Sequence, residues 1–220
     1  MQDITLQVEN VSLVLKKQEI LNGVNLTLHG GTIYGLVGHN GSGKTMLMKC
    51  MCGFVQVSSG KILINGKQIQ RDIDYLPNAG IIIENPGFLP YYTGYKNLSI
   101  LASIRHTIDR KKIRLAMEEM GLDPALKLPV RKYSLGMRQR LGLAQAIMED
   151  PDILILDEPF NGLDQDGVDM LRKKLMSWRD AGRLILLASH SAEDIGLLCD
   201  EVYQVKEHRV QQQKGYSSAV

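Results

Sequence analysis

The first third of the chain alternates apolar and polar residues, which is the period-two pattern of strands that bury one face. The alternation loses its phase near Asn10, and this slip predicts a β-bulge there. Residues 62–69 are expected to form a strand, an Asn65-Gly66 turn of type I′ and a return strand. We therefore expect an antiparallel β part early in the chain, built on the alternating residues Ile4, Leu6, Val8, Val24, Leu26 and Leu28.

The middle of the chain, residues 90–150, has the wider apolar spacing of helices. The pattern is clearest at 113–120 and 135–148, and Pro124 and Pro129 interrupt it between those two segments. We expect these helices to form a lobe of their own.

Apolar strands return at 153–156 and 184–188, and a helical stretch at 168–179 separates them. Strands that alternate with helices predict an α/β fold with a mostly parallel sheet, into which the helical lobe is inserted. The last residues, 211–220, carry little apolar pattern and are expected to be a frayed tail.

Composition limits the possible classes of protein. The chain has 220 residues, 44% of them hydrophobic, which is enough for one domain with an inserted lobe. Its net charge of +2 gives no sign of nucleic-acid binding. Residues 105–140 hold ten Lys or Arg against four Asp or Glu. That excess indicates either a solvated helical face or a surface turned toward anionic headgroups or an acidic partner.

No apolar run is long enough to span a membrane, and the start of the chain lacks a signal-peptide pattern, so we expect a cytosolic protein. The three cysteines, Cys50, Cys52 and Cys199, are then expected to be reduced thiols. Cys50 and Cys52 lie among several methionines, but their helical spacing favours core packing over a soft-metal site.

A phosphate-binding loop stands between an apolar strand at 33–37 and a helix at 45–52. Such loops turn successive backbone N–H groups toward phosphates, while Lys44 reaches the β and γ oxygens and the Thr45 hydroxyl can bind Mg²⁺. The motif predicts a P-loop nucleotide-binding core of mixed or parallel α/β type. Its residues are Gly38, His39, Asn40, Gly41, Ser42, Gly43, Lys44 and Thr45.

Two carboxylates follow the apolar strand at 153–156. Open α/β sheets bind ligands at the carboxyl ends of their strands, so Asp157 and Glu158 are expected at the ligand. Asp157 is predicted to hold Mg²⁺ through its water shell, and Glu158 to accept a proton from the attacking water.

A third motif, Tyr133-Ser134-Leu135-Gly136-Met137-Arg138-Gln139-Arg140, resembles the signature motif of ATP-binding cassette (ABC) proteins. It keeps the Ser-x-Gly core and departs from the common form at Tyr133, Leu135 and Met137. Asn161-Gly162-Leu163-Asp164 follows as a D-loop, and His190 ends the last core strand. The resemblance covers nearly the whole chain.

The resemblance implies a head-to-tail dimer that clamps ATP between the phosphate loop of one copy and the signature helix of the other. In that scheme Ser134 and Gly136 contact the γ-phosphate bound by the partner copy, and His190 positions that phosphate. Asp164 connects the two sites. Residues 1–86 and 153–210 are expected to form the core, and 87–152 the helical lobe.

Two positions depart from the family pattern. The first aromatic residue is Tyr34, so Leu15 takes the place of the aromatic residue that usually stacks on adenine, and base selectivity is expected to be loose. Glu84 takes the place of the glutamine that touches Mg²⁺ and the attacking water and senses the transport partner. Asn78 is the alternative residue for that second role.

The glutamate and the altered signature resemble the bacitracin and lantibiotic self-protection subfamily of bacterial ABC exporters. The resemblance implies an ATPase subunit on the inner face of the membrane that uses MgATP to drive a separate permease. No nucleic-acid partner is expected. The rival hypotheses are a non-transport ABC ATPase that acts on ribosomes or DNA, and a regulatory module that barely hydrolyses nucleotide.

Overall fold

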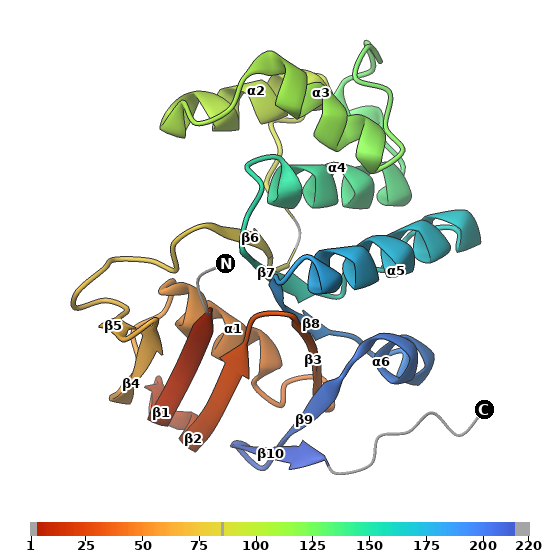
Figure 1. Cartoon of the computed structure of the whole chain (residues 1–220). Coiled ribbons are helices and arrows are strands. Elements are labelled where there is room, and N and C mark those ends of the chain that lie inside the picture. The colour runs from red at the N-terminus through yellow and green to blue at the C-terminus, as the bar shows by residue number, and fades with distance from the viewer. Residues whose placement is uncertain (1–3, 85, 214–220) are drawn as a thin grey trace.

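A computed structural model describes residues 4–84 and 86–213 of the chain (Figure 1). It contains a small antiparallel sheet, a larger and mostly parallel sheet, and a lobe of helices above them. The small sheet has the order β2-β1-β4-β5. Its strands are β1 (Thr5–Leu15), β2 (Gln18–His29), β4 (Ser59–Ile64) and β5 (Lys67–Gln68).

Both local predictions for the small sheet are confirmed. The pairing of β1 with β2 shifts register between Val8 and Val11, and Asn10 between them has a φ of +49°. This is the expected bulge. Asn65 and Gly66 have φ values of +47° and +79°, as a type I′ turn requires, and they join β4 to β5.

The large sheet has the order β10-β9-β3-β8-β7-β6. The pairings from β9 to β6 are parallel, and β9 with β10 forms an antiparallel hairpin at the edge. The strands are β3 (Thr32–Val37), β6 (Ala79–Ile82), β7 (Ile153–Asp157), β8 (Leu184–Ala188), β9 (Glu201–Lys206) and β10 (Arg209–Gln213). The predicted α/β class with a mostly parallel sheet is confirmed.

The expectation of a frayed tail from residue 211 is wrong for its first three residues. Gln211, Gln212 and Gln213 pair with β9 as part of β10. An edge strand is held by its backbone hydrogen bonds and needs no apolar side chains, so its polar sequence gave no signal. Residues 214–220 lie outside the described residues.

Successive residues of the large sheet pack into two different cores, because strand side chains alternate between faces. In β8, Ile185 and Leu187 pack with α5 (Gln165–Asp180) and α6 (Ala192–Leu198). Leu184 and Leu186 pack on the other face with α1 (Lys44–Cys52) and the small sheet. Helices and strands therefore cover both faces of the parallel sheet, which explains its continuous apolar runs.

The helical lobe is inserted between β6 and β7, as predicted. It consists of α2 (Gly94–Arg105), α3 (Arg110–Glu119), a 3₁₀ turn (Val130–Lys132) and α4 (Leu135–Ile147). Side-chain oxygens cap the three α-helices: those of Thr93, Asp109 and Ser134 accept backbone N–H groups. None of the described helices combines the length and the hydropathy of a membrane span.

Cys50 and Cys52 lie in the core around α1. Burial raises the pKa of the Cys50 thiol to about 11 and that of Cys52 to about 12. Both side chains therefore remain neutral thiols at physiological pH and act as small apolar residues, in line with the expected core packing.

Candidate nucleotide-binding site

Three strands of the parallel sheet deliver the predicted catalytic residues to one edge. The phosphate loop follows β3, Asp157 ends β7, and His190 comes two residues after β8. The pairings of β3 with β8 and of β8 with β7 are parallel, so the carboxyl ends of all three strands meet. Ligands of open α/β sheets bind at such an edge.

The phosphate loop folds tightly at this edge. Gly43, which directly precedes α1, has a φ of +107°, and a side chain on Gly38 would meet the carbonyl oxygen of Val205 at 2.5 Å. Lys44 Nζ donates to the carbonyl oxygens of Gly38 at 2.7 Å and His39 at 3.3 Å. The loop thus places a nearly buried cation at a helix N-terminus, where the helix dipole favours an anion.

Thr45 and Asp157 make the contact that joins the loop to β7. The Thr45 hydroxyl donates to Asp157 Oδ2 at 2.7 Å, although 112 positions separate the two residues. Hydroxyl and carboxylate oxygens are the hard ligands that Mg²⁺ prefers. The pair therefore fits the metal role predicted for both residues.

Glu158 lies beside this pair and faces His190. His190 Nε2 is 3.3 Å from Glu158 Oε1, and the backbone N–H of His190 donates to Oε2 at 3.4 Å. Glu158 has a φ of +51°, which is costly for a residue with a side chain. Burial raises the pKa of Glu158, and the nearby His190 partly offsets the rise. A raised pKa suits a general base that works near neutral pH.

These groups surround a cavity of about 320 Å³. Ile20, which the sequence analysis did not single out, also lines it. Two buried side-chain oxygens in the described part of the chain make no hydrogen bond, Ser42 Oγ and Glu158 Oε1, and both residues line this cavity. Unpartnered polar groups at a phosphate loop fit a polar ligand with a metal ion. The lining residues are Ile20, Asn40, Gly41, Ser42, Gly43, Lys44, Thr45, Met46, Asp157, Glu158 and His190.

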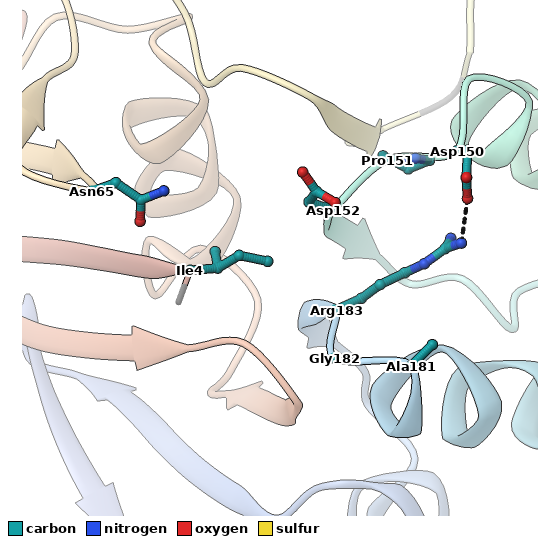
Figure 2. A pocket seen from close by; sticks show the side chains of 8 residues that line it. All are labelled: Ile4, Asn65, Asp150, Pro151, Asp152, Ala181, Gly182 and Arg183. Carbon is teal, nitrogen blue, oxygen red and sulfur yellow. Dashed lines mark hydrogen bonds and ion pairs between the residues drawn. The ribbon is translucent and has the colours of Figure 1, made fainter. Parts of the chain in front are cut away.

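A second cavity, of about 360 Å³, lies at the opposite edge of the parallel sheet (Figure 2). Its lining residues 150–152 precede β7 and residues 181–183 precede β8, while Ile4 and Asn65 reach it from the small sheet. Arg183, which could bind an anion there, is paired with Asp150. This cavity lacks the loop and the free polar oxygens of the first, so we place the nucleotide at the phosphate loop.

Glu84 and Asn78, the two alternatives for the residue that senses the transport partner, lie at opposite edges of the parallel sheet. Glu84 follows β6 at the same sheet edge as Asp157, but its Oε1 accepts from Lys49 Nζ at 2.6 Å, and Glu84 does not line the cavity. Asn78 precedes β6 at the opposite edge, where its side chain donates to Asp152. Its position disfavours Asn78 as a residue of the nucleotide site.

Leu15 is 40% exposed at the end of β1 and does not line the cavity. Ile20, five residues later in the same hairpin, does line it. Its carbonyl oxygen would lie 3.1 Å from a side chain on Gly43. Ile20, and not Leu15, is therefore the residue of this hairpin that lines the cavity at the phosphate loop.

Ser134 and Gly136 of the signature motif lie beside the D-loop, and neither they nor Asp164 line the cavity. Ser134 caps α4 by accepting the Met137 N–H at 3.1 Å, and Asp164 caps α5 by accepting the Gly167 N–H at 3.1 Å. A side chain on Gly136 would lie 2.6 Å from the Gly162 carbonyl oxygen, so the first turn of α4 touches the D-loop. These residues do not reach the cavity of their own chain.

The family model described as ABC transporter matches residues 21–161. The chain belongs to the ABC transporter family. A lantibiotic transport ATP-binding protein of Streptococcus pyogenes is 34% identical over 97% of this chain and 92% of its own length. A bacitracin transport ATP-binding protein of Enterococcus faecalis is 38% identical over 91% of this chain and 66% of its own length.

Solved ABC proteins share the fold. A structure described as an ATP-binding subunit of an ABC transporter has a TM-score of 0.85 and 26% identity, and the match covers 95% of this chain and 89% of that one. The present chain is accordingly an ABC ATPase, the nucleotide-binding component of a transport system. The predicted family and enzyme class are confirmed.

The raised pKa of Glu158 predicts how the stability of this ABC ATPase depends on pH. Folding favours the neutral carboxyl, so that contribution to stability is present below the ordinary pKa of 4.5 and is lost as pH rises through the higher folded pKa. Glu158→Gln removes the ionisation. The stability of the variant relative to the native chain should therefore grow from pH 4 to pH 8, as measured by urea unfolding without nucleotide.

Glu207→Gln is the matched control, because Glu207 also has a positive φ, of +49°, and its side chain is 83% exposed. It should follow the native chain at every pH. Parallel curves for Glu158→Gln and the native chain would show that burial of the Glu158 carboxylate does not affect folding.

Proposed function

We propose that this chain is the ATPase subunit of a bacterial ABC exporter, which binds and hydrolyses MgATP in a head-to-tail dimer and drives a separate membrane permease. The observation that carries the proposal is the contact of Thr45 with Asp157 beside Glu158 and His190. This is a complete set of groups for phosphate, metal and water at one sheet edge.

Mg²⁺ would be held by the Thr45 hydroxyl and, through its water shell, by Asp157, with Glu84 as a further carboxylate near the same edge. When bound, the ion would neutralise charge on the phosphate oxygens. Ser42 and Thr45 offer hydroxyls at the loop, and Lys44 supplies the cation that binds the β and γ phosphates. Lys44 would exchange its bonds to the Gly38 and His39 carbonyls for bonds to phosphate.

Glu158 is the proposed general base. Its Oε1 makes no hydrogen bond, although His190 Nε2 lies 3.3 Å away, so this oxygen can accept a proton from water. Burial raises the pKa of Glu158, as suits a base. His190 is proposed to position the γ-phosphate, because it lines the cavity directly beside Glu158, with its Nε2 3.3 Å from Glu158 Oε1. The groups at this sheet edge then supply what hydrolysis needs, except for contacts to the side of the γ-phosphate that faces away from the phosphate loop.

A second copy would supply that far side. Ser134 and Gly136 lie at the N-terminus of α4, a position suited to an anion, yet they do not line the cavity of their own chain. A head-to-tail dimer brings them to the γ-phosphate of the partner copy. Asp164 would then lie between the two sites. An aliphatic contact at the base, from Leu15 in the family position or from Ile20, would leave base selectivity loose.

The cargo is proposed to be a peptide antibiotic or a similar amphiphile, on the strength of the lantibiotic and bacitracin relatives. Export and a location on the inner face of the membrane follow from the same likeness. A separate membrane chain is proposed as the permease, on the strength of the same transport ATP-binding relatives. No nucleic-acid partner is proposed.

Affinity purification from detergent-solubilised membranes of the source cell tests this function. A stable hydrophobic membrane protein should co-purify with the tagged chain, and its cargo should stimulate ATP hydrolysis. Recovery of ribosomes or DNA in place of a membrane protein would contradict the proposal and favour the non-transport alternative.

Glu158→Gln should keep ATP affinity and lower turnover by about 10² to 10⁴, the loss expected for a positioned general base. Because the dimer would no longer hydrolyse ATP and dissociate, the ATP-bound dimer should accumulate. Turnover is measured by phosphate release and the dimer by size-exclusion chromatography with ATP. Normal hydrolysis by a variant that stays monomeric would refute the role of Glu158.

Glu84→Gln should leave the ATP affinity of the isolated chain within severalfold and weaken hydrolysis modestly, because the amide keeps one oxygen for the metal. When the permease is present, the stimulation of ATP hydrolysis by cargo should fall much further. The control is Glu9→Gln, since Glu9 also pairs with a lysine, Lys61 at 3.0 Å, but on the small sheet. Equal losses of ATP hydrolysis with and without the permease would show that Glu84 acts only as a local metal ligand.

A further inference from the structure

The signature segment and the D-loop, which the proposed dimer presents to the partner copy, are bonded to each other within one chain. Gln139 Nε2 on α4 donates to the carbonyl oxygen of Pro159 at 2.8 Å. Gly136 closely approaches the backbone of Gly162, as described above. The strongest link in this contact is an ion pair in which Arg140 Nη2 donates to Asp164 Oδ1 at 2.7 Å.

Arg140 joins three elements. It belongs to α4, its Nη1 donates to the carbonyl oxygen of Met120 at the end of α3 at 3.2 Å, and its Nη2 reaches Asp164 at the start of α5. Its side chain is 17% exposed. One guanidinium thus connects the helical lobe, which contains α3 and α4, to the core, which contains α5.

Glycines provide the space for this guanidinium. A side chain on Gly121 would lie 2.5 Å from Arg140 Nη1, and one on Gly167 would lie 2.6 Å from Nη2. The planar fork of arginine can serve two acceptors in different directions, whereas a lysine offers a single point charge. The glycines on both sides therefore leave space for an arginine guanidinium. A salt bridge formed by chance on the surface would not need this space.

Asp164 uses one oxygen for two purposes. Oδ1 accepts both from Arg140 and from the Gly167 N–H at 3.1 Å, which caps α5. The hydrogen bond from Arg140 is the first cause that holds the pKa of Asp164 below its usual value. The carboxylate is thus fixed in place while most of its surface, 72% of the side chain, stays exposed to a partner.

We propose that Arg140 is a positioning residue: it holds Asp164 at a fixed place relative to Ser134, so that the signature segment and the D-loop meet the partner copy as one rigid surface. The role rests on the proposed head-to-tail dimer, but the positioning itself is a property of the single chain. Closure of the helical lobe then moves Asp164 together with Ser134, and binding at one site is transmitted to the other.

Amide hydrogen exchange on the nucleotide-free monomer tests the positioning. Arg140→Gln should accelerate exchange of the Gly167 amide and its neighbours by about two- to fivefold, the range for an exposed charge pair. Arg172→Gln is the matched control, because Arg172 lies elsewhere on α5, its side chain is 15% exposed, and it pairs with Asp194 on α6 at 2.6 Å. Unchanged exchange in Arg140→Gln, or the same acceleration at Gly167 in Arg172→Gln, would overturn the proposal.

The second readout is the ATP concentration at which the Glu158→Gln chain dimerises. Adding Arg140→Gln should raise that concentration about two- to fivefold without changing the ATP affinity of the monomer. Arg140→Lys should partly restore the original concentration, and Arg172→Gln should leave it unchanged. In a chain that also carries Asp164→Asn, whose side-chain oxygen still caps α5, Arg140→Gln should have little further effect on the dimerisation midpoint. Equal midpoints with and without Arg140→Gln would overturn the proposal. A Glu158→Gln chain that never dimerises would instead contradict the proposed function, and the exchange result would still decide the role of Arg140.

Discussion

The hydrogen bond from the Thr45 hydroxyl to Asp157 is the contact on which the site depends. It joins the helix after β3 to the end of β7, and β8 lies between those two strands in the sheet. The contact therefore requires the whole parallel arrangement to be in register. The same register places Glu158 and His190 around one cavity, because both follow strands that end at that edge.

The site is polar, and without a ligand some of its buried oxygens make no hydrogen bond. Ser42 Oγ and Glu158 Oε1 lack hydrogen-bond partners, Glu158 is in the left-handed region, and its carboxyl is pushed toward the neutral form by burial. Each feature lowers the stability of the empty protein. In the proposed function, nucleotide and metal would satisfy these groups, and the free energy of the empty site would then contribute to affinity. The same burial raises the pKa of the proposed base, Glu158.

Short motifs predicted most of the fold and the centre of the site, because their chemistry is local. The phosphate loop and the Asn65-Gly66 turn each need particular residues at fixed offsets. Contacts between distant segments gave no such signal. Examples are Ile20 at the cavity, the Lys49 pairing of Glu84 and the three-way bonding of Arg140, which depend on how the strands and the lobe meet. The strand β10 was missed because backbone pairing at a sheet edge is independent of side-chain polarity.

Calorimetric titration of MgATP into the native chain and into Lys44→Ala tests most directly that the edge around Thr45 and Asp157 is the nucleotide site. Lys44 is the side-chain cation of the phosphate loop, and it now rests on the loop's own carbonyls at 2.7 and 3.3 Å. The native chain should bind one nucleotide per copy, and the variant, folded by circular dichroism, should show no measurable binding. Retained affinity in Lys44→Ala would place the phosphates elsewhere and contradict the site.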